Sequence, residues 1–308
     1  MNVYYRIDEF QPVRNAVVTT GTFDGVHLGH QQIISRLKET AQRIGGQTVL
    51  LTFFPHPRMV LFPERKQLLL NTLEEKIALL EKAGINHLVI QPFTREFSML
   101  SSRDFIEKIL VRKLGTKMLV IGYDHHFGKN REGSFEQLVK SGPVYGYGVE
   151  EIPGKEVEHV RVSSTRIRQA LEAGDVETAQ AFLGYRYRLK GTVVKGKQLG
   201  RTLGFPTANL LVDDPYKMVP ADGVYAVQVF RNEAVYGGML NIGIRPTLNG
   251  TDRTIEVNLF DFDGDLYGET IRIEFVKRLR AEQKFDNPDE LKVQIGRDRE
   301  NALLVLKK

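Results

Sequence analysis

The spacing of hydrophobic and polar residues differs between the two halves of the chain. In the first half, apolar runs predict buried strands at residues 16–20, 47–54, 87–91, 117–121 and 148–152. Between the first two runs, apolar residues recur at helical spacing from Ile33 to Ile44. Strands that alternate with amphipathic helices predict βαβ units, and therefore a parallel sheet with helices on both faces.

Two further helices of this half have recognisable ends. One starts with a capping box of Thr72 and Glu75 and is closed by Gly84, and the other spans about residues 103–114. In the segment 55–57, prolines flank a histidine, which predicts a fixed corner after the second strand. Ligands of parallel sheets bind beyond the carboxyl ends of the strands, so we expect the loops there to converge on one site.

The periodicity changes after a basic segment at residues 184–188. Short segments rich in β-branched and aromatic residues then follow without intervening helices, at residues 190–195, 224–230, 235–242, 254–260 and 270–275. Turn dipeptides separate several of them, so the pattern predicts a small antiparallel β-barrel. Asn287 and Pro288 predict the start of a final helix that packs against it. We therefore expect two domains, residues 1–183 and 184–308.

Composition adds few further limits. The chain has 308 residues, which suits about two domains. Its net charge of +5 suits anionic small molecules as well as nucleic acid, so charge does not decide between them. The absence of cysteine excludes disulfides and thiolate metal sites. The polar N-terminal segment has no signal-like apolar core and no run is long enough to span a membrane, so we expect a cytoplasmic protein.

A glycine-rich decapeptide, Gly21–His30, lies between the first predicted strand and the first predicted helix. At such a turn, free backbone N–H groups and the helix dipole favour an anion. His27 and His30 are three residues apart, so on the first helical turn they lie on the same side and can donate to a phosphate in a transition state. The decapeptide lacks the Gly-Lys-Ser/Thr of a P-loop. Its pattern instead resembles that of the HxGH nucleotidyltransferases.

Two later stretches favour the same chemistry. Residues 122–133 form a polar loop punctuated by glycines after a predicted strand, and residues 161–168 open a helix with hydroxyls and arginines. A helix start that carries these groups predicts a phosphate site. Together with the decapeptide, the two stretches resemble the FMN adenylyltransferase module of bacterial bifunctional riboflavin kinase/FAD synthetases. The resemblance implies a Rossmann-like α/β domain.

The resemblance also implies roles for single residues of the first half. His27 and His30 would bind and neutralise the phosphates of ATP, next to Gly21 and Phe23. The triphosphate would be held by Arg161, Ser164, Thr165 and Arg168. Asp124 would lie near FMN. His125 stands where relatives more often carry an aromatic residue.

The chemistry of the second half centres on a glycine- and lysine-rich stretch, residues 191–209. Backbone amides of such a loop can wrap phosphates, although a flexible loop between strands is an alternative. Thr207 and Asn209 alternate along an extended segment, and their oxygens are hard ligands suited to Mg²⁺ carrying ATP. Residues 204–209, 241–247 and 255–268 resemble signature stretches of the riboflavin kinase fold.

This second resemblance implies a kinase site. Glu256 would be the base that activates the riboflavin hydroxyl, and Thr207 and Asn209 would coordinate Mg–ATP. The other implied contacts are ATP with Gly196, Lys197 and Phe205, and flavin with Arg280 and Glu282. Asn258 departs from the histidine of many relatives.

The predicted function is thus a pair of reactions in one chain. The second half would phosphorylate riboflavin to FMN with ATP, and the first half would adenylylate FMN to FAD with release of pyrophosphate. The alternatives are a chain with only one active module, another HxGH nucleotidyltransferase, a class I aminoacyl-tRNA synthetase-like protein, and a flavin- or nucleic-acid-binding regulator. We expect ATP, riboflavin and FMN as partners, weak self-association at most, and neither nucleic acid nor membrane.

Overall fold

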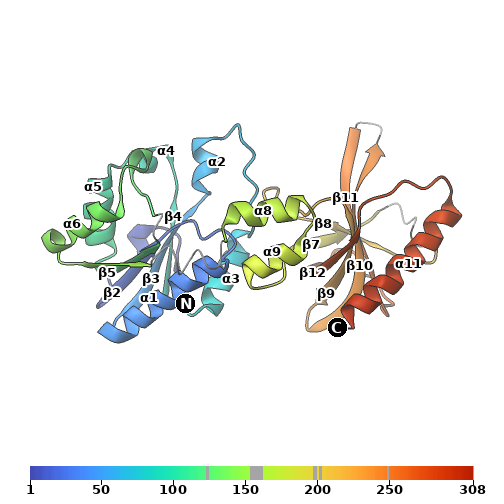
Figure 1. The fold of residues 1–308 in the computed structure, drawn as a ribbon, viewed down its shortest axis with the longest axis horizontal. Coiled ribbons are helices and arrows are strands. Elements are labelled where there is room, and N and C mark those ends of the chain that lie inside the picture. Colours follow the sequence, from blue (N-terminus) through green and yellow to red (C-terminus); the bar gives the residue numbers. More distant parts are fainter. Residues whose placement is uncertain (123–124, 153–161, 197–199, 201–202, 248–249, 308) are drawn as a thin grey trace. The chain divides into compact units, whose positions relative to one another are not determined.

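The computed structural model describes residues 1–122, 125–152, 162–196, 200, 203–247 and 250–307. They form two compact units, Met1–Ser164 and Thr165–Lys308, which we call the first and the second unit (Figure 1). The division falls within helix α8 (Ser164–Glu172). The functional boundary that the sequence predicts after Leu183 stays a prediction.

The first unit is built on a six-stranded sheet in which every pairing is parallel. Its strands are β1 (Asn2–Tyr4), β2 (Ala16–Thr20), β3 (Gln47–Phe54), β4 (His87–Pro92), β5 (Thr116–Gly122) and β6 (Gly148–Ile152). Their order is β1-β4-β3-β2-β5-β6, so the direction of winding reverses between β2 and β5. In open α/β sheets, ligands bind at this point, beyond the carboxyl ends of the strands.

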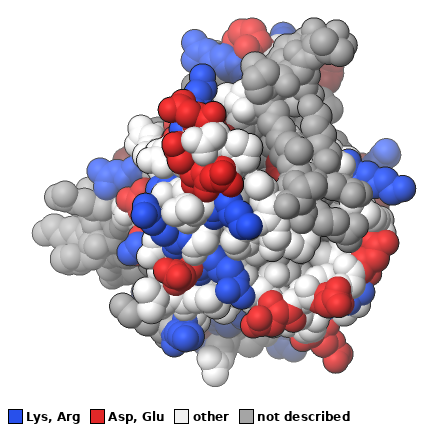
Figure 2. Space-filling model, turned by 90° about the vertical axis from the view of Figure 1, so that its right-hand side faces the viewer, with Lys and Arg blue, Asp and Glu red and all other residues white. Residues whose placement is uncertain are grey.

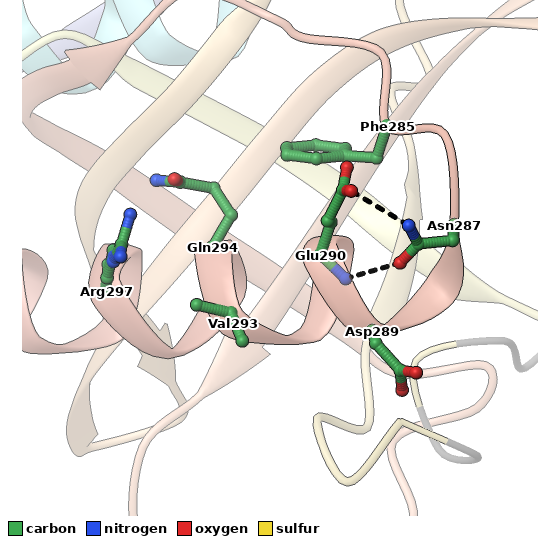
Figure 3. Close-up of a pocket in the computed structure, with 7 residues that line it drawn as sticks. All are labelled: Phe285, Asn287, Asp289, Glu290, Val293, Gln294 and Arg297. Atoms are coloured by element: carbon green, nitrogen blue, oxygen red, sulfur yellow. Dashed lines mark hydrogen bonds between the residues drawn. The ribbon is translucent and has the colours of Figure 1, made fainter.

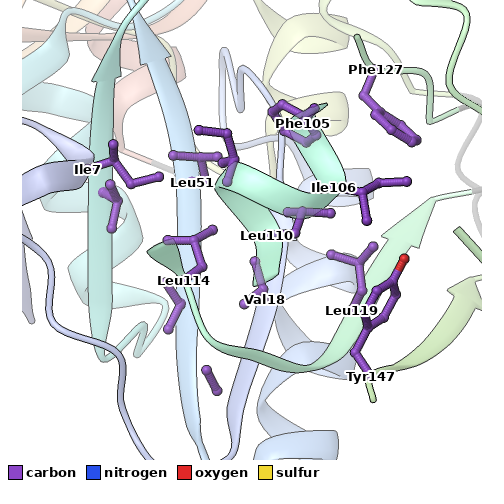
Figure 4. Packing of buried hydrophobic residues seen from close by; sticks show 14 of the residues in the cluster. Ile7, Val18, Leu51, Phe105, Ile106, Leu110, Leu114, Leu119, Phe127 and Tyr147 are labelled. Atoms are coloured by element: carbon purple, nitrogen blue, oxygen red, sulfur yellow. The ribbon is translucent and has the colours of Figure 1, made fainter. Parts of the chain in front are cut away.

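Alternate residues of each strand supply the two cores of this unit. Val17 and Leu50 face one side, where helices α1 (Leu28–Ile44) and α3 (Leu73–Lys82) cover them. Val18 faces the other side, with the core shown in Figure 4. The elements η1 (Ile7–Glu9), η2 (Phe105–Lys113) and α6 (Phe135–Tyr145) cover that side. Each fully buried leucine contributes about 1.5–3 kcal/mol. The predicted two-sided parallel sheet is confirmed.

The helix expected over residues 103–114 has an unexpected geometry. After α5 (Ser102–Asp104), η2 is a π-helix, and the N–H of Leu114 donates to the carbonyl oxygen of Ile109, five residues back. Phe105, Ile106, Ile109, Leu110 and Leu114 are buried, and Val111 is partly buried. Four short helices have too few residues for a periodic signal and were not predicted: α2 (Pro57–Leu61), α4 (Arg95–Ser98), η1 and η3 (Lys129–Arg131).

The second unit is built on a closed six-stranded barrel with antiparallel pairings. Its strands are β7 (Arg188–Val194), β8 (Ala208–Leu211), β9 (Gly223–Arg231), β10 (Ala234–Thr247), β11 (Gly250–Leu259) and β12 (Thr270–Arg280). Helix α9 (Val176–Leu183) packs against β12, and α11 (Pro288–Leu306) packs against β9 and β10. The antiparallel barrel with a final helix is confirmed.

Charges of both signs intermingle on the face shown in Figure 2. Within the second unit, Arg231 pairs with Glu269 at 2.6 Å and Arg253 with Asp222 at 2.7 Å. Such pairs at the surface contribute little to stability, typically about 0–1 kcal/mol. In these ion pairs, carboxylates lie next to basic side chains. The net charge of +5 therefore does not by itself identify a surface that binds anions.

Candidate active sites

The first candidate site is built on the turn that joins β2 to α1. This turn begins where the winding of the sheet reverses, and it holds Phe23, Gly25 and Val26 at φ of 47°, 91° and 38°. Left-handed backbone is open to glycine but unfavourable for phenylalanine and above all for a β-branched valine. Strain of about 1–3 kcal/mol per residue persists only where surrounding contacts impose it.

Several hydrogen bonds impose this conformation. The carbonyl oxygen of Thr22 accepts from Lys76 Nζ at 2.8 Å and from Thr52 Oγ1 at 3.2 Å. The carboxylate of Asp24 accepts from two backbone N–H groups of the loop that precedes α3. Ser164 Oγ donates to the carbonyl oxygen of Asp24 at 2.8 Å. The structure therefore brings Ser164, a predicted phosphate ligand, to the turn.

The two histidines of the turn form one unit. His27 is the N-cap of α1, and its Nδ1 accepts from the backbone N–H of His30 at 3.4 Å. In its neutral form, His27 consequently carries its proton on Nε2, which is a hydrogen-bond donor. The rings are stacked with centroids 3.7 Å apart. Burial, then the neighbouring His27 and then Lys76, lower the pKa of His30 well below its usual 6.5. His30 is therefore uncharged near neutral pH.

Other predicted residues lie around this pair. A Cβ on Gly21 would come within 3.1 Å of the Phe23 ring, which itself lies 4.8 Å from the ring of His30. Thr20, the last residue of β2, shares a hydrogen bond of 3.3 Å with Nε2 of His125. The loop after β5 thus reaches the end of β2, as the position of the two loops in the sheet predicts.

The remaining predicted contacts of this site stay predictions. Asp124 and Arg161 lie outside the described residues, as does Lys197 of the predicted kinase site. Thr165 and Arg168 belong to the part of α8 that lies in the second unit.

The second candidate site lies where β8 meets β11. Asn209 pairs with Glu256 in the register of these strands, and Thr207 Oγ1 donates to Glu256 Oε2 at 3.2 Å. The structure therefore gathers a hydroxyl, an amide oxygen and a carboxylate that are up to 49 residues apart in sequence. The Thr207 hydroxyl donates its proton to the Glu256 carboxylate, so the lone pairs of Oγ1 can coordinate a cation.

Two glycines allow neighbouring groups to approach closely at this site. A Cβ on Gly196 would lie 2.1 Å from Asn209 Nδ2, and one on Gly200 would lie 2.3 Å from the carbonyl oxygen of Phe205. Only glycine permits such close approach. Asn258, buried on β11, donates from Nδ2 to the carbonyl oxygen of Pro206 at 2.6 Å. It thereby ties the residue before Thr207 to the same strand as Glu256.

The two residues predicted on the flavin side have clear surroundings. Arg280 forms a bidentate pair with the buried Asp298 of α11, with Nη2 2.8 Å from Oδ2. Its guanidinium also lies 5.8 Å from the ring centroid of Phe285. Glu282 lies against β10, where a Cβ on Gly243 would come within 2.0 Å of Oε1. Flavin contact by either residue stays a prediction.

A pocket lies between the chain after β12 and the first turns of α11 (Figure 3). Its volume is about 460 Å³, and its lining residues are Phe285, Asn287, Asp289, Glu290, Val293, Gln294 and Arg297. Asn287 caps α11 by accepting from the N–H of Glu290 at 2.9 Å, while Glu290 accepts from Asn287 Nδ2 at 2.8 Å. Phe285 and Val293 are the apolar residues of this lining, and the other five are polar or charged.

Sequence reasoning missed Lys76 and Asp298, which hold parts of these sites. Lys76 lies on the buried face of α3, four residues before the buried Leu80. A lysine within an apolar stripe is a sequence signal that could have pointed to it. Asp298 lies in a helix rich in charged residues, where nothing in the local pattern sets it apart.

Comparisons with known proteins find relatives of both units. The sequence matches the family model of FAD synthetase over residues 10–166 and that of riboflavin kinase over residues 183–306. It is 39% identical over 291 residues to the bifunctional riboflavin kinase/FMN adenylyltransferase of Haemophilus influenzae, covering 94% of both chains. It is 39% identical to the protein of the same name from Bacillus subtilis, covering 94% of this chain and 92% of that relative.

A solved structure is similar over nearly the whole chain. It is described as a macrolide-efflux protein from Streptococcus pneumoniae and matches with a TM-score of 0.88 and 33% identity, covering 97% of both chains. Among the described residues of the present chain, no helix is long and apolar enough to cross a membrane. The two family models and the full-length relatives show that this chain belongs to the bifunctional riboflavin kinase/FMN adenylyltransferase family, with the FAD synthetase module first and the riboflavin kinase module second.

Proposed function

We propose that each of the two reactions is carried out by one of the candidate sites. The observation that carries this proposal is that the His27–His30 stack lies in the first unit and the Thr207–Glu256 hydrogen bond in the second. Residues 1–183 would then form the adenylyltransferase and residues 184–308 the kinase.

In adenylyl transfer, a phosphate oxygen of FMN attacks the α-phosphorus of ATP, and the bond to pyrophosphate breaks. FMN is already anionic, so this step needs donors that offset charge rather than a base. The Nε2–H of His27 and the stacked His30 supply such donors at the start of α1. Ser164, Thr165, Arg161 and Arg168 would hold the triphosphate, Gly21 and Phe23 would border it, and Asp124 would lie near FMN.

In phosphorylation, the terminal ribityl oxygen of riboflavin attacks the γ-phosphorus of ATP, and the bond to ADP breaks. Glu256 would take the hydroxyl proton, since a neutral hydroxyl is a weak nucleophile. The Thr207 hydroxyl and Asn209 amide oxygens fit Mg²⁺, and the missing side chain at Gly196 lets the backbone of the loop approach Asn209 closely. Bound Mg²⁺ would neutralise charge on the phosphates. Gly196, Lys197 and Phe205 would border this ATP.

The pocket beside α11 suits the flavin ring of the kinase substrate. Its volume of about 460 Å³ falls in the range of small-molecule sites, and Phe285 offers a face for stacking. Arg280 and Glu282 would shape this side of the site. Weak self-association, a cytoplasmic location and the absence of nucleic acid and membrane partners remain predictions from the sequence.

Labelled ATP tests this assignment on the unmodified chain. With riboflavin and magnesium present, label in the γ-phosphate should enter both FMN and FAD, whereas label in the α-phosphate should enter FAD alone. Chromatography of the flavins separates the two products. Label from the α-phosphate in FMN, or FAD that carries none of it, would contradict the proposal.

A further inference from the structure

Lys76 is a buried cation next to the first candidate site. Its exposed fraction is 6%, and that of Asp24, whose charge faces it, is 2%. Lysine is almost never this buried unless its charge has a partner. By contrast, Lys82 at the end of the same helix is exposed. The turn therefore contains a built arrangement of opposite charges, not a surface lysine that happens to lie nearby.

The contacts of Lys76 and Asp24 fix both halves of the turn. Lys76 Nζ donates to the carbonyl oxygen of Thr22, which immediately precedes the left-handed Phe23. Asp24 accepts from the backbone N–H of Leu70 at 3.0 Å, so the same loop that leads into α3 also holds the carboxylate. Both hydrogen bonds come from a segment about 50 residues away. They hold the turn in a left-handed backbone conformation that is unfavourable without such contacts.

Lys76 also acts on the histidines through its charge. Burial is the main cause that lowers the pKa of His30, and the charges of His27 and Lys76 act in the same direction. Burial lowers the pKa of Lys76 itself, while Asp24 opposes that shift and favours the charged lysine. His27, Lys76 and Asp24 are thus the titratable groups in this network around His30.

We infer that Lys76 is a positioning residue for adenylyl transfer, which holds the Gly21–His30 turn through the Thr22 carbonyl oxygen and places a fixed positive charge near the histidine pair. The inference rests on the proposed role of the first site. A displacement of about 1 Å in a catalytic group can cost roughly 100-fold in rate, so the anchor matters although Lys76 need not touch ATP.

Four variants test this role in the full chain: K76M, K76R, the exposed control K82M, and H30A as the benchmark for the site. For each, kcat and KM for FAD formation from FMN are measured across pH, below the unfolding temperature, with riboflavin phosphorylation as the internal control. K76M should lower kcat for FAD formation by about 10- to 100-fold and leave phosphorylation within about twofold of the parent. K76R, which keeps charge and donor, should recover part of the loss, and K82M should behave as the parent.

The pH profile separates positioning with charge from a merely structural role. Removing the positive charge makes protonation of His30 easier, so the corresponding inflection should move to higher pH in K76M and not in K76R. Parental kinetics in K76M would overturn the inference, and so would an equal loss in both variants with unmoved inflections. If H30A itself leaves FAD formation unchanged, the proposed site is wrong, whatever the result for Lys76.

Discussion

The rings of His27 and His30 stack with their centroids 3.7 Å apart and their planes inclined by 16°. Nδ1 of His30 is buried and has no hydrogen-bond partner among the described residues. The uncharged His30 and the N-cap His27 form a preorganised group at a helix start. Such a group costs little reorganisation when charge develops on a phosphate. Substitution of either ring should therefore damage the same step.

H27A and H30A should each abolish FAD formation and leave FMN accumulating from riboflavin. Loss of an electrostatic donor of this kind typically costs about 100- to 1,000-fold in kcat. Chromatography of the flavin products measures both reactions at once. The matched control is H87Q, because His87 is the first residue of β4, whereas the turn follows the carboxyl end of the parallel strand β2. FAD formation at the parental rate in H30A would contradict the assignment.

The stability of the first unit should fall in mild acid. Burial lowers the pKa of both His30 and His87 below 6.5. Below about pH 6.5 the unfolded chain takes up protons that the folded chain resists, so the free energy of unfolding is highest above that pH and falls towards the lower folded pKa. Urea unfolding between about pH 7.5 and pH 5.5 measures this slope. H30Q and H87Q should each flatten it, and an unchanged slope in both would refute the explanation.

E256Q should block riboflavin phosphorylation while added FMN is still converted to FAD. Glutamine keeps the size of the side chain and can still receive the hydrogen bond from Thr207, but it cannot take a proton. Loss of a general base costs about 100- to 10,000-fold. D263N, in the exposed turn after β11, is the control. A parental phosphorylation rate in E256Q would show that Glu256 is not the base.

Asn258 should affect the kinase by positioning the backbone at Pro206 and not by transferring a proton. N258A and N258D both lose the donor to the Pro206 carbonyl oxygen, and we expect KM for Mg–ATP to rise about 3- to 10-fold. N258H retains a side-chain N–H donor and should stay near the parent. Steady-state kinetics at saturating riboflavin measure the difference. Equal KM values in N258D and the parent would exclude the positioning role.

Asp298 should be needed for the stability of the second unit and for riboflavin binding. D298A leaves the partly buried Arg280 without its carboxylate, which costs about 3–5 kcal/mol for buried pairs. We expect a lower unfolding midpoint and a higher KM for riboflavin. The double variant R280M/D298L removes both charges and should recover much of the stability. If D298A matches the parent in both measurements, the pair does not support this side of the site.

Both folds could be predicted from the sequence, because each half has its own pattern of hydrophobic residues. Neighbours such as Val17 and Val18 enter opposite cores, which an apolar run between helices predicts. The short strand β1 gives too few residues for a pattern. The apolar spacing of the π-helix η2 resembles that of an ordinary helix, so no local pattern distinguishes the two.

The candidate sites were predictable only where chemistry lies in a motif. His27 and His30 stand in one decapeptide, whereas Lys76 acts on a backbone oxygen 54 residues away. Every residue has a backbone carbonyl oxygen, so a sequence pattern cannot show which side chain will bind a particular one. The same holds for Asn258 and the carbonyl oxygen of Pro206, 52 residues apart.

The central claim is that two separate sites carry the two reactions, and a mixture of variants tests it most directly. H30A and E256Q, each alone with riboflavin, ATP and magnesium, should form no FAD: the first stops at FMN and the second leaves riboflavin unchanged. Mixed in equal amounts, they should form FAD, because FMN made by H30A is adenylylated by E256Q. FMN that accumulates in the mixture without FAD, or FAD from either variant alone, would contradict the account.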